Sequence, residues 1–232
     1  MNLYPYLILI LGAIALTLFL IVRDKKGSVE ALLLKTITSF LFISLAFASY
    51  MVNSSHSIAT FFMLIMMGLI CGLIGDIVLD LKIMYPESNS LYQHGGMIAF
   101  FIGHLFYITA LIVYFGFNWI PLVIAIVLGV IINAVSKFVL KFNFKEHTID
   151  CYAYSFILAY FMTQACYSAF SVGFTASTVL LGIGSILFLL SDLILVMTYY
   201  DHKDAKVFIV SNHVLYYAAQ FLLAISVLYM VA

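Results

Sequence analysis

Charged residues are scarce in this sequence. Only 9% of its 232 residues are Asp, Glu, Lys or Arg, and ten basic residues balance ten acidic ones. A typical soluble domain has about 25% charged residues, so this chain has too few polar side chains to cover a water-soluble globule. The absence of a basic patch argues against nucleic-acid binding, and a hydrophobic content of 66% argues against a disordered chain.

Cysteine and proline are also rare. The three cysteines, Cys71, Cys151 and Cys166, lie in apolar stretches without a Cys-x-x-Cys pair, so the sequence predicts neither a disulfide framework nor a zinc ribbon. The histidines show no His-x-x-x-His or His-Glu-x-x-His spacing. We therefore expect no metal site and no cofactor. Only three prolines are present, and no apolar run is clearly broken by Gly and Pro.

Long apolar runs dominate what is present. A helix that crosses a bilayer needs about 20 mostly apolar residues, and short polar breaks divide this chain into eight such runs. The runs cover residues 3–22, 31–52, 58–81, 91–114, 119–140, 149–170, 175–200 and 207–230. Because the connections are short, we expect consecutive helices to be antiparallel neighbours. The predicted fold class is an all-α membrane protein, a bundle of eight transmembrane helices that forms one domain over residues 1–232.

The sequence also contains a weak sign of an internal duplication. Asp76 and Asp192 are 116 residues apart, half the length of the chain, and each follows small residues late in an apolar run. Two four-helix halves related by a parallel repeat would give this pattern. Recurrence of Gly and Leu in any membrane protein is the alternative explanation.

The basic residues predict the orientation of the bundle. They are Arg23, Lys25, Lys26, Lys35, Lys82, Lys137, Lys141, Lys145, Lys203 and Lys206. All ten lie in or near the first, third, fifth and seventh loops, and the other loops and both termini have none. Cytoplasmic loops carry the excess of Lys and Arg. We therefore expect the odd-numbered loops in the cytoplasm and both termini outside, in a cell membrane, with the compact loops favouring a bacterial cytoplasmic membrane.

Ionisable residues inside the predicted spans mark candidate functional positions, because they are costly in a bilayer. They are Lys35, Asp76, Asp80, His94, His104, Asp192 and His213, with the neutral polar residues Asn133, Gln164, Asn212 and Gln220. The ionisable residues lie in the half of the membrane nearer the odd-numbered loops, with His104 nearer the middle. This asymmetry predicts a polar pocket that opens toward the cytoplasm.

Asp76 and Asp192 are the strongest candidates, because each lies between apolar residues where an unpaired charge would be costly. Asp80 lies at the end of its run and is expected to be a solvated charge or a partner of Lys82. Lys35 either extends to the interface or neutralises a carboxylate inside the membrane.

The remaining candidates have plain structural explanations as well. His213 and Asn212 fit interfacial or capping positions, and His104 fits a histidine in the core. Gly68, Gly72 and Gly75 have the spacing that lets another helix approach closely, which would position Asp76.

Several short motifs occur in an order that resembles a known family. They are LLLKTITSFLF around Lys35, GLIGDIVL around Asp76, GMIAFFIGHLFYI around His104, LLSDLILV around Asp192 and YYAAQFLL around Gln220. Together they resemble the lysoplasmalogenase (YhhN-like) family of eight-span membrane proteins over nearly the whole chain. Two features depart from the family pattern: Thr36 follows Lys35 where many members have proline, and Asp80 is not part of the pattern.

The resemblance implies hydrolysis of the vinyl ether bond of a lysophospholipid, the lysoplasmalogen, which yields a fatty aldehyde and a glycerophospho-alcohol. As in glycoside cleavage, an oxocarbenium-like transition state suits two carboxylates, and Asp76 and Asp192 fit these roles. Lys35, His104, Tyr107 and Gln220 would bind or orient the substrate or water. We attach less weight to Asp80, His94, Asn133 and His213. Lys137, Lys141 or Lys203 would attract the phosphate.

Two other functions stay open at this point. The histidines and aspartates would permit a metal-dependent lipid hydrolase, although the ligand spacing is poor. Intramembrane Asp and His residues also relay protons in transporters. The sequence does not indicate an oligomeric state.

Overall fold

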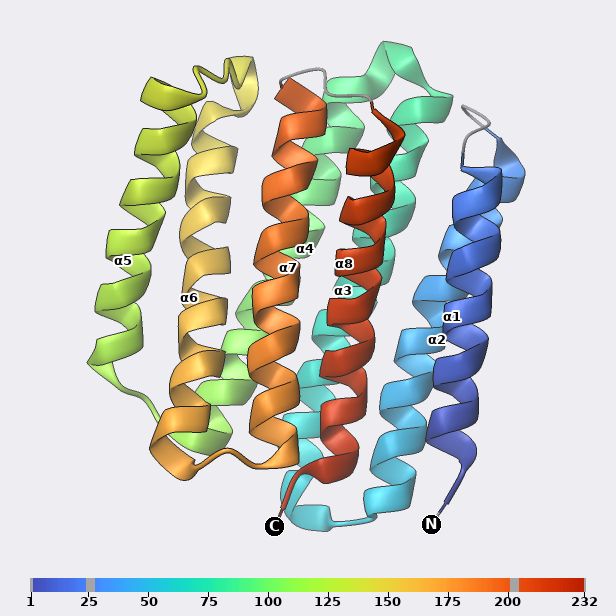
Figure 1. Cartoon of the computed structure of the whole chain (residues 1–232), viewed down its shortest axis with the longest axis vertical. Helices are drawn as coiled ribbons and strands as arrows, with labels where there is room; N and C mark the ends of the chain where they lie inside the picture. The colour runs from blue at the N-terminus through green and yellow to red at the C-terminus, as the bar shows by residue number, and fades with distance from the viewer. Residues whose placement is uncertain (1, 24–27, 201–204, 232) are drawn as a thin grey trace.

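The computed structural model describes residues 2–23, 28–200 and 205–231, and within these ranges the regular structure is entirely helical (Figure 1). The long helices are α1 (Tyr4–Val22), α2 (Val29–Asn53), α3 (Ala59–Met84), α4 (Asn89–Phe115), α5 (Trp119–Ala134), α6 (Thr148–Val172), α7 (Ala176–Tyr200) and α8 (Lys206–Ser226). Short helical turns are η1 (His56–Ile58), η2 (Pro86–Ser88), η3 (Val135–Val139), η4 (Lys145–His147) and η5 (Val227–Tyr229). The predicted all-α bundle is confirmed.

Local sequence signals explain where several helices begin and end. Ser28 caps α2 by accepting a hydrogen bond from Ala31 N, and Asn118 caps α5 by accepting one from Ile120 N. α4 and α6 are each followed by a glycine with positive φ, Gly116 at 89° and Gly173 at 104°. α5 ends earlier than predicted, at Ala134, and the chain continues as the π-helical turn η3.

Both chain ends lie at the same end of the bundle (Figure 1). The C-terminal ends of α1, α3, α5 and α7 lie at the opposite end, which we call the basic end. Its basic residues in the described ranges are Arg23, Lys35, Lys82, Lys137, Lys141, Lys145 and Lys206. Lys25, Lys26 and Lys203 lie outside the described residues.

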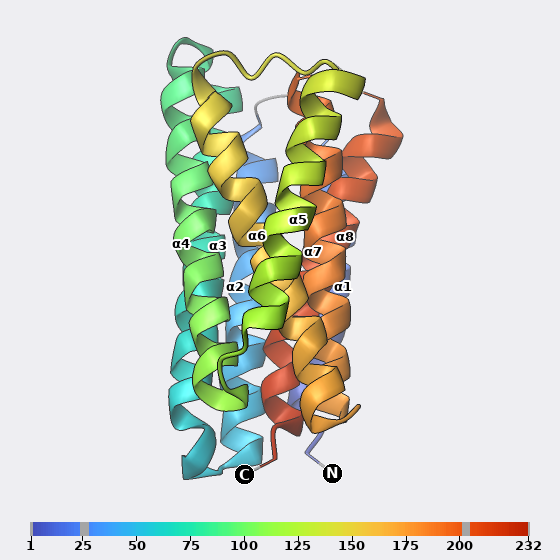
Figure 2. The same cartoon turned by 90° about the vertical axis from the view of Figure 1, so that its left-hand side faces the viewer.

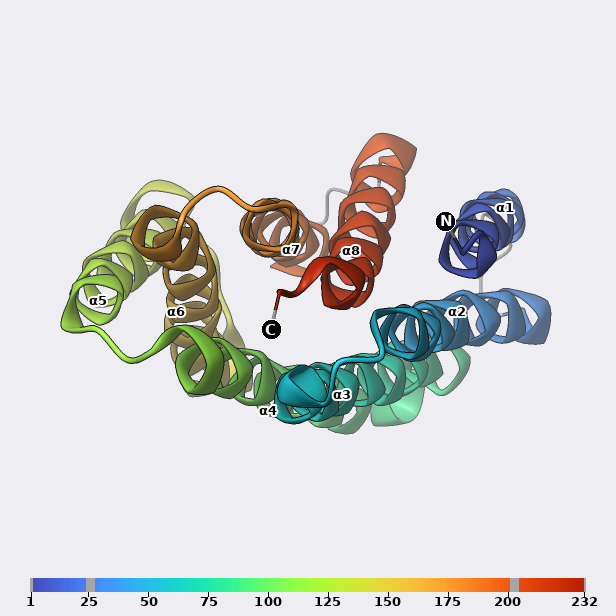
Figure 3. The same ribbon diagram turned by 90° about the horizontal axis from the view of Figure 1, so that it is seen from below.

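Six helices form a closed ring, in the order α2, α3, α4, α6, α7 and α8, with α8 also against α2 and α3. α1 packs outside this ring on α2 and α8, and α5 packs outside it on α6 (Figures 2 and 3). The expectation that consecutive helices are neighbours is therefore wrong for α4 and α5. The connection between them is short, but α4 packs mainly on α3 and α6, so that α5 occupies the edge of the bundle.

The outer surface of the bundle is apolar. On α1, the exposed side chains of Leu7, Leu11, Ile14 and Leu18 form a stripe with helical spacing. Among the described residues, seven helical segments are long and apolar enough to cross a membrane. α6 has 25 residues, but its tyrosine, serine, threonine and glutamine side chains make it less apolar than the others. The chain is a multi-pass membrane protein.

Glycines allow α3 to approach α4 and α8 closely, as the sequence predicts. A Cβ atom on Gly68 would lie 2.2 Å from Cε1 of Tyr107 in α4. On Gly72 it would lie 2.5 Å from Nε2 of Gln220 in α8. Gly68 and Gly72 therefore make room for two polar side chains next to the helix that carries Asp76.

We expect Gly68→Ala to destabilise the protein by about 1–3 kcal/mol, the usual cost of overpacking a filled core. The ring of Tyr107 cannot move away easily, because it is buried and its hydroxyl donates to Gln220 Oε1 at 2.8 Å. Gly182→Ala is the matched control, since the nearest heavy atom to its new Cβ is 4.0 Å away. Thermal unfolding of both variants in detergent tests this, and equal stability of the two would contradict the packing argument.

Candidate active site

A cavity of about 390 Å³ lies within the half of the bundle nearer the basic end. Its volume falls in the range of small-molecule sites, about 300–1,000 Å³. Charged side chains line it from the end of α1, from α2, α3 and α7: Arg23, Lys35, Asp76, Asp80, Lys82 and Asp192. The opposite wall, formed by α5, η3 and parts of α4 and α6, is mostly apolar. The charged groups of the cavity therefore come from one set of helices, and among the described residues the other set adds none.

Asp76, in α3, is buried and surrounded by polar groups from two other helices. Its Oδ2 accepts hydrogen bonds from Ser39 Oγ in α2 at 2.6 Å and from Tyr216 OH in α8 at 2.8 Å. Its Oδ1 lies 3.5 Å from Lys35 Nζ. A carboxylate with a nearby cation and two short donors is stabilised in its ionised form.

Lys35 is the cation of this site and does not extend to the interface. Its side chain is 6% exposed, and its Nζ donates to Asp80 Oδ1 at 3.0 Å and to the backbone oxygen of Asp76 at 3.2 Å. The expectation that Asp80 is a solvated edge charge is wrong, because the side chain of Asp80 is 10% exposed and paired with Lys35. α3 continues beyond Asp80 to Met84, which places this carboxylate inside the bundle.

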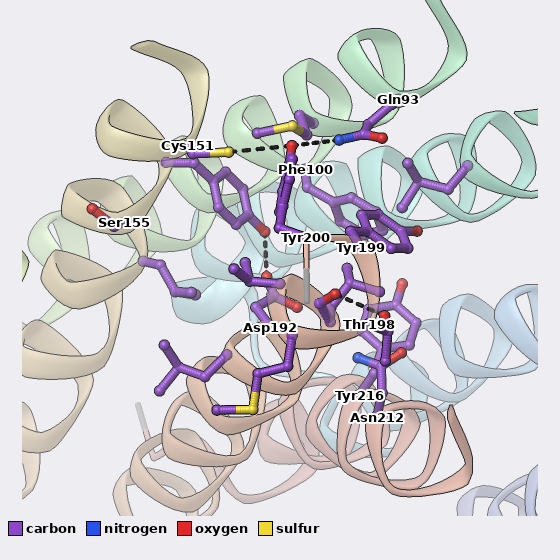
Figure 4. A pocket seen from close by; sticks show the side chains of 18 of the residues that line it. Gln93, Phe100, Cys151, Ser155, Asp192, Thr198, Tyr199, Tyr200, Asn212 and Tyr216 are labelled. Atoms are coloured by element: carbon purple, nitrogen blue, oxygen red, sulfur yellow. Dashed lines mark hydrogen bonds between the residues drawn. The ribbon is translucent and has the colours of Figure 1, made fainter. Parts of the chain in front are cut away.

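Asp192, in α7, lines the same cavity but has different partners. Tyr154 OH in α6 donates to its Oδ2 at 2.6 Å, and the neighbouring Ser191 Oγ donates to its Oδ1 at 3.1 Å (Figure 4). Asn212 Nδ2 in turn donates to the backbone oxygen of Ser191 at 2.8 Å. Among the described residues, Asp192 forms no salt bridge, so its donors are neutral.

Tyr107 and Gln220 do not line the cavity, contrary to a direct role in binding substrate. They form a buried chain that ends at Asp76: Tyr107 OH donates to Gln220 Oε1, and Gln220 Nε2 donates to Tyr216 OH at 3.1 Å. Since Tyr216 donates to Asp76, these two residues orient the hydroxyl that holds the carboxylate.

His104 is also absent from the cavity lining. Its Nδ1 donates to the Phe100 backbone oxygen at 2.7 Å, while its Nε2 has no hydrogen-bond partner among the described residues. The ring packs edge-on against Tyr154 and Phe188. The predicted meeting of His104 with the two aspartates at one cavity is therefore wrong for the histidine.

The other candidates are divided between the cavity and its surroundings. Asn133 lines the cavity and accepts a hydrogen bond from Ser155 Oγ at 2.9 Å. His213 lines it as well, and its Nδ1 donates to the Ile209 backbone oxygen at 2.7 Å. His94 does not line the cavity; its half-exposed side chain pairs with Asp150 at 2.7 Å.

The cations at the cavity differ from those expected to attract a phosphate. Arg23 and Lys82 line it together with Lys35. Lys137 and Lys141 are exposed outside it, and Lys203 lies outside the described residues. Lys82 Nζ lies over the ring of Tyr199, and Arg23 Nε has no hydrogen-bond partner among the described residues.

Three partners of the aspartates that come from other helices were not predicted: Ser39, Tyr154 and Tyr216. Ser39 and Tyr154 gave no signal, because hydroxyl side chains are common in this chain, which has 16 tyrosines. Tyr216 had one usable signal. It lies four residues before Gln220, so the two share a helix face.

One cluster in the described residues could hold a metal ion, contrary to the expectation from sequence spacing. It consists of His94, His147 and Asp150, which come from two separate segments. A search for local motifs misses such a cluster.

We expect Lys35→Met to destabilise the protein by about 3–5 kcal/mol, because it leaves the carboxylate of Asp80 buried without its cation. Lys137→Met removes an exposed lysine and serves as the control. Unfolding measurements on the double variant Lys35→Met/Asp80→Leu should show a smaller loss than the sum of the single losses. Strict additivity would show that the two side chains are not coupled.

Comparison with known proteins gave one match. The model of the YhhN family matches residues 30–227, which span the seven long helices from α2 to α8 and most of the chain. The comparison with curated proteins gave no match, and neither did the comparison with solved structures. The match covers both aspartates and every helix of the ring. The chain belongs to the YhhN family.

Proposed function

We propose that this protein is an intramembrane hydrolase that cleaves the vinyl ether bond of lysoplasmalogens. Membership of the YhhN family supports a membrane lysoplasmalogenase-like function at family level. The observation that carries the specific proposal is the presence of two buried carboxylates, Asp76 and Asp192, on one cavity in unlike surroundings. Vinyl ether hydrolysis needs a proton donor and is favoured by an anion beside the developing oxocarbenium ion, and a protonated and an ionised carboxyl group can fill these two roles.

The reaction begins with transfer of a proton to the β-carbon of the vinyl ether, which creates an oxocarbenium ion. Water then adds to the carbon attached to oxygen and loses a proton, giving a hemiacetal. The hemiacetal breaks its bond to the glycerol oxygen, which takes the hydroxyl proton. One water molecule is consumed, and the products are a fatty aldehyde and a glycerophospho-alcohol.

The surroundings of the two aspartates suggest how they divide this work. Asp192 is buried and, among the described residues, pairs with no cation, so the uncharged carboxylic acid is favoured there more than at Asp76 and can supply the proton. After that transfer its carboxylate takes the proton lost by water. Asp76 stays ionised beside Lys35 and stabilises the positive charge of the oxocarbenium ion.

The lining of the cavity suits a single-chain lipid. Ile131, Ile132 and Leu158 offer an apolar wall for the alkenyl chain. Arg23 and Lys82 offer positive charge for the phosphate, which replaces the earlier expectation for Lys137 and Lys141. The substrate would thus be a lysophospholipid with an ethanolamine or choline head group, taken from the surrounding bilayer.

The two alternatives have less support. A metal-dependent hydrolase at this cavity would need nitrogen and oxygen ligands around the aspartates. In the described part of the chain, the only group of at least three His, Cys, Asp or Glu ligand atoms is the one at His94, His147 and Asp150, away from both catalytic candidates. A proton-coupled transporter needs polar groups along a path to both sides of the membrane, whereas the charged side chains here cluster at the basic end.

We expect the purified protein to release fatty aldehyde from lysoplasmenyl ethanolamine or choline, and Asp76→Asn and Asp192→Asn each to lower kcat at least about 100-fold. That is the low end for a positioned acid–base group. Asparagine keeps the shape but neither donates a carboxylic proton nor carries the charge. Because both groups act on one transition state, the double variant should lose much less than the product of the single losses.

The matched control substrate is the saturated ether analogue, which has no double bond to protonate and should remain intact. Glu87→Gln is the control variant, since Glu87 is exposed and does not line the cavity. Near-normal turnover by a folded Asp76 or Asp192 variant would refute the two-carboxylate mechanism, and absence of aldehyde release by the unmodified protein would refute the reaction.

We further propose that the basic end faces the cytoplasm of the cell that hosts the protein, with both termini outside, following the charge bias of the loops. A reporter enzyme that is active only outside the cytoplasm should be active when fused to either terminus. Fluorescence of a green fluorescent protein fused at the C-terminus would place that end in the cytoplasm and contradict this orientation.

A further inference from the structure

A second group of polar side chains lies at the basic end, outside the cavity. It joins His94 in the second turn of α4 to His147 in η4 and Asp150 in the first turn of α6. His94 Nδ1 lies 2.7 Å from Asp150 Oδ2, and His147 Nδ1 lies 3.6 Å from the same oxygen. The three ligand atoms, one from each residue, all lie within 4.8 Å of one another.

These distances are close to those of a metal site. Zinc bound tetrahedrally at about 2.0–2.2 Å from nitrogen and oxygen ligands places neighbouring ligand atoms about 3.3–3.5 Å apart. The contact between His147 and Asp150 already has this length, and the one between His94 and Asp150 must widen by well under 1 Å. Three protein ligands with an open fourth position for water are a common zinc arrangement.

The surroundings supply orienting groups on the side of the His147 ring that faces away from Asp150. Glu146 Oε1 lies 3.7 Å from His147 Nε2. Ser90 Oγ donates to Glu146 Oε1 and lies 3.3 Å from His147 Nε2. A hydrogen-bond partner on the ring nitrogen that does not bind the metal fixes the orientation of a ligating histidine. The rings of His94 and His147 are stacked with centroids 6.4 Å apart, so both present an edge to the same space beside Asp150.

The three side chains of the cluster differ in their exposure to solvent, and this difference bears on how an ion would enter. The side chain of His147 is 9% exposed, that of Asp150 30% and that of His94 48%. Two of the ligands are therefore held by packing, and the third lies at the surface, where an ion from solution can reach it without opening the bundle.

We propose that His94, His147 and Asp150 bind one divalent transition-metal ion of the zinc class, which clamps the start of α4 to the start of α6. Two imidazole nitrogens and one carboxylate oxygen favour zinc, nickel or copper over magnesium, which prefers oxygen ligands. This proposal does not depend on the proposed hydrolase function.

The clamp lies directly beside the cavity in sequence. Gln93 precedes His94, Cys151 follows Asp150, and both line the cavity. The hydroxyl of Tyr200 lies between them, with Gln93 Nε2 at 2.5 Å and Cys151 Sγ at 3.6 Å (Figure 4). A metal ion on His94 and Asp150 would fix the spacing of these two helices where they form the cavity wall.

The test is calorimetric titration of zinc chloride into the full-length protein, purified without a polyhistidine tag and treated with chelator. We expect about one zinc ion per chain, a raised thermal unfolding temperature and no response to magnesium chloride. His94→Ala, His147→Gln and Asp150→Asn should each weaken zinc binding at least tenfold. Using three separate variants keeps the test valid if one of them does not fold.

His56→Ala is the matched control, because it removes an exposed histidine at the opposite end of the bundle and should leave zinc binding unchanged. A stoichiometry well below one, or equal affinity in all the variants, would overturn the proposal and leave the group as a hydrogen-bonded cluster. Since the readout is metal binding, loss of aldehyde release in these proteins does not enter the decision.

Discussion

The bundle depends on how it accommodates the carboxylate of Asp76. A charged side chain at the centre of a membrane helix costs about 2.5–3.5 kcal/mol on insertion scales, and removing one partner of a buried pair costs about as much again or more. α3 cannot supply the partners itself. They come from α2, with Lys35 and Ser39, and from α8, with Tyr216. The need to satisfy one carboxylate therefore fixes the positions of three helices, and Asp80 binds the same lysine at 3.0 Å.

The sequence was sufficient for features that depend on position along one helix. Apolar runs located the helices, the lysines identified the end of the bundle that holds the cavity, and burial cost selected Asp76 and Asp192. Features that depend on contacts between helices could not be predicted. The sequence shows that Asp80 lies near the end of its apolar run, which predicts a solvated charge. It does not show that Asp80 pairs with Lys35 of another helix. Tyr154 gave no signal for the same reason.

The arrangement of the helices agrees with two related four-helix halves. α1 packs on α2 as α5 packs on α6, and the contacts of α2 with α3 and of α3 with α4 recur as those of α6 with α7 and of α7 with α8. α2 also meets α8 as α6 meets α4. The offset of 116 residues that relates the two aspartates relates their surroundings too: Ser39 with Ser155, Asp76 with Asp192, Phe100 with Tyr216, and His104 with Gln220.

The same offset shows where the halves differ, and this difference is what the proposed chemistry needs. Position 151 corresponds to Lys35, and it is a cysteine. Asp192 consequently has no counterpart of the lysine that accompanies Asp76, and its strongest partner is the neutral hydroxyl of Tyr154. Two carboxylates in identical surroundings would have the same intrinsic affinity for a proton, whereas the proposed hydrolysis assigns the acid to one carboxyl group and the anion to the other. Placing one lysine in one half of an otherwise repeated bundle is enough to create that inequality.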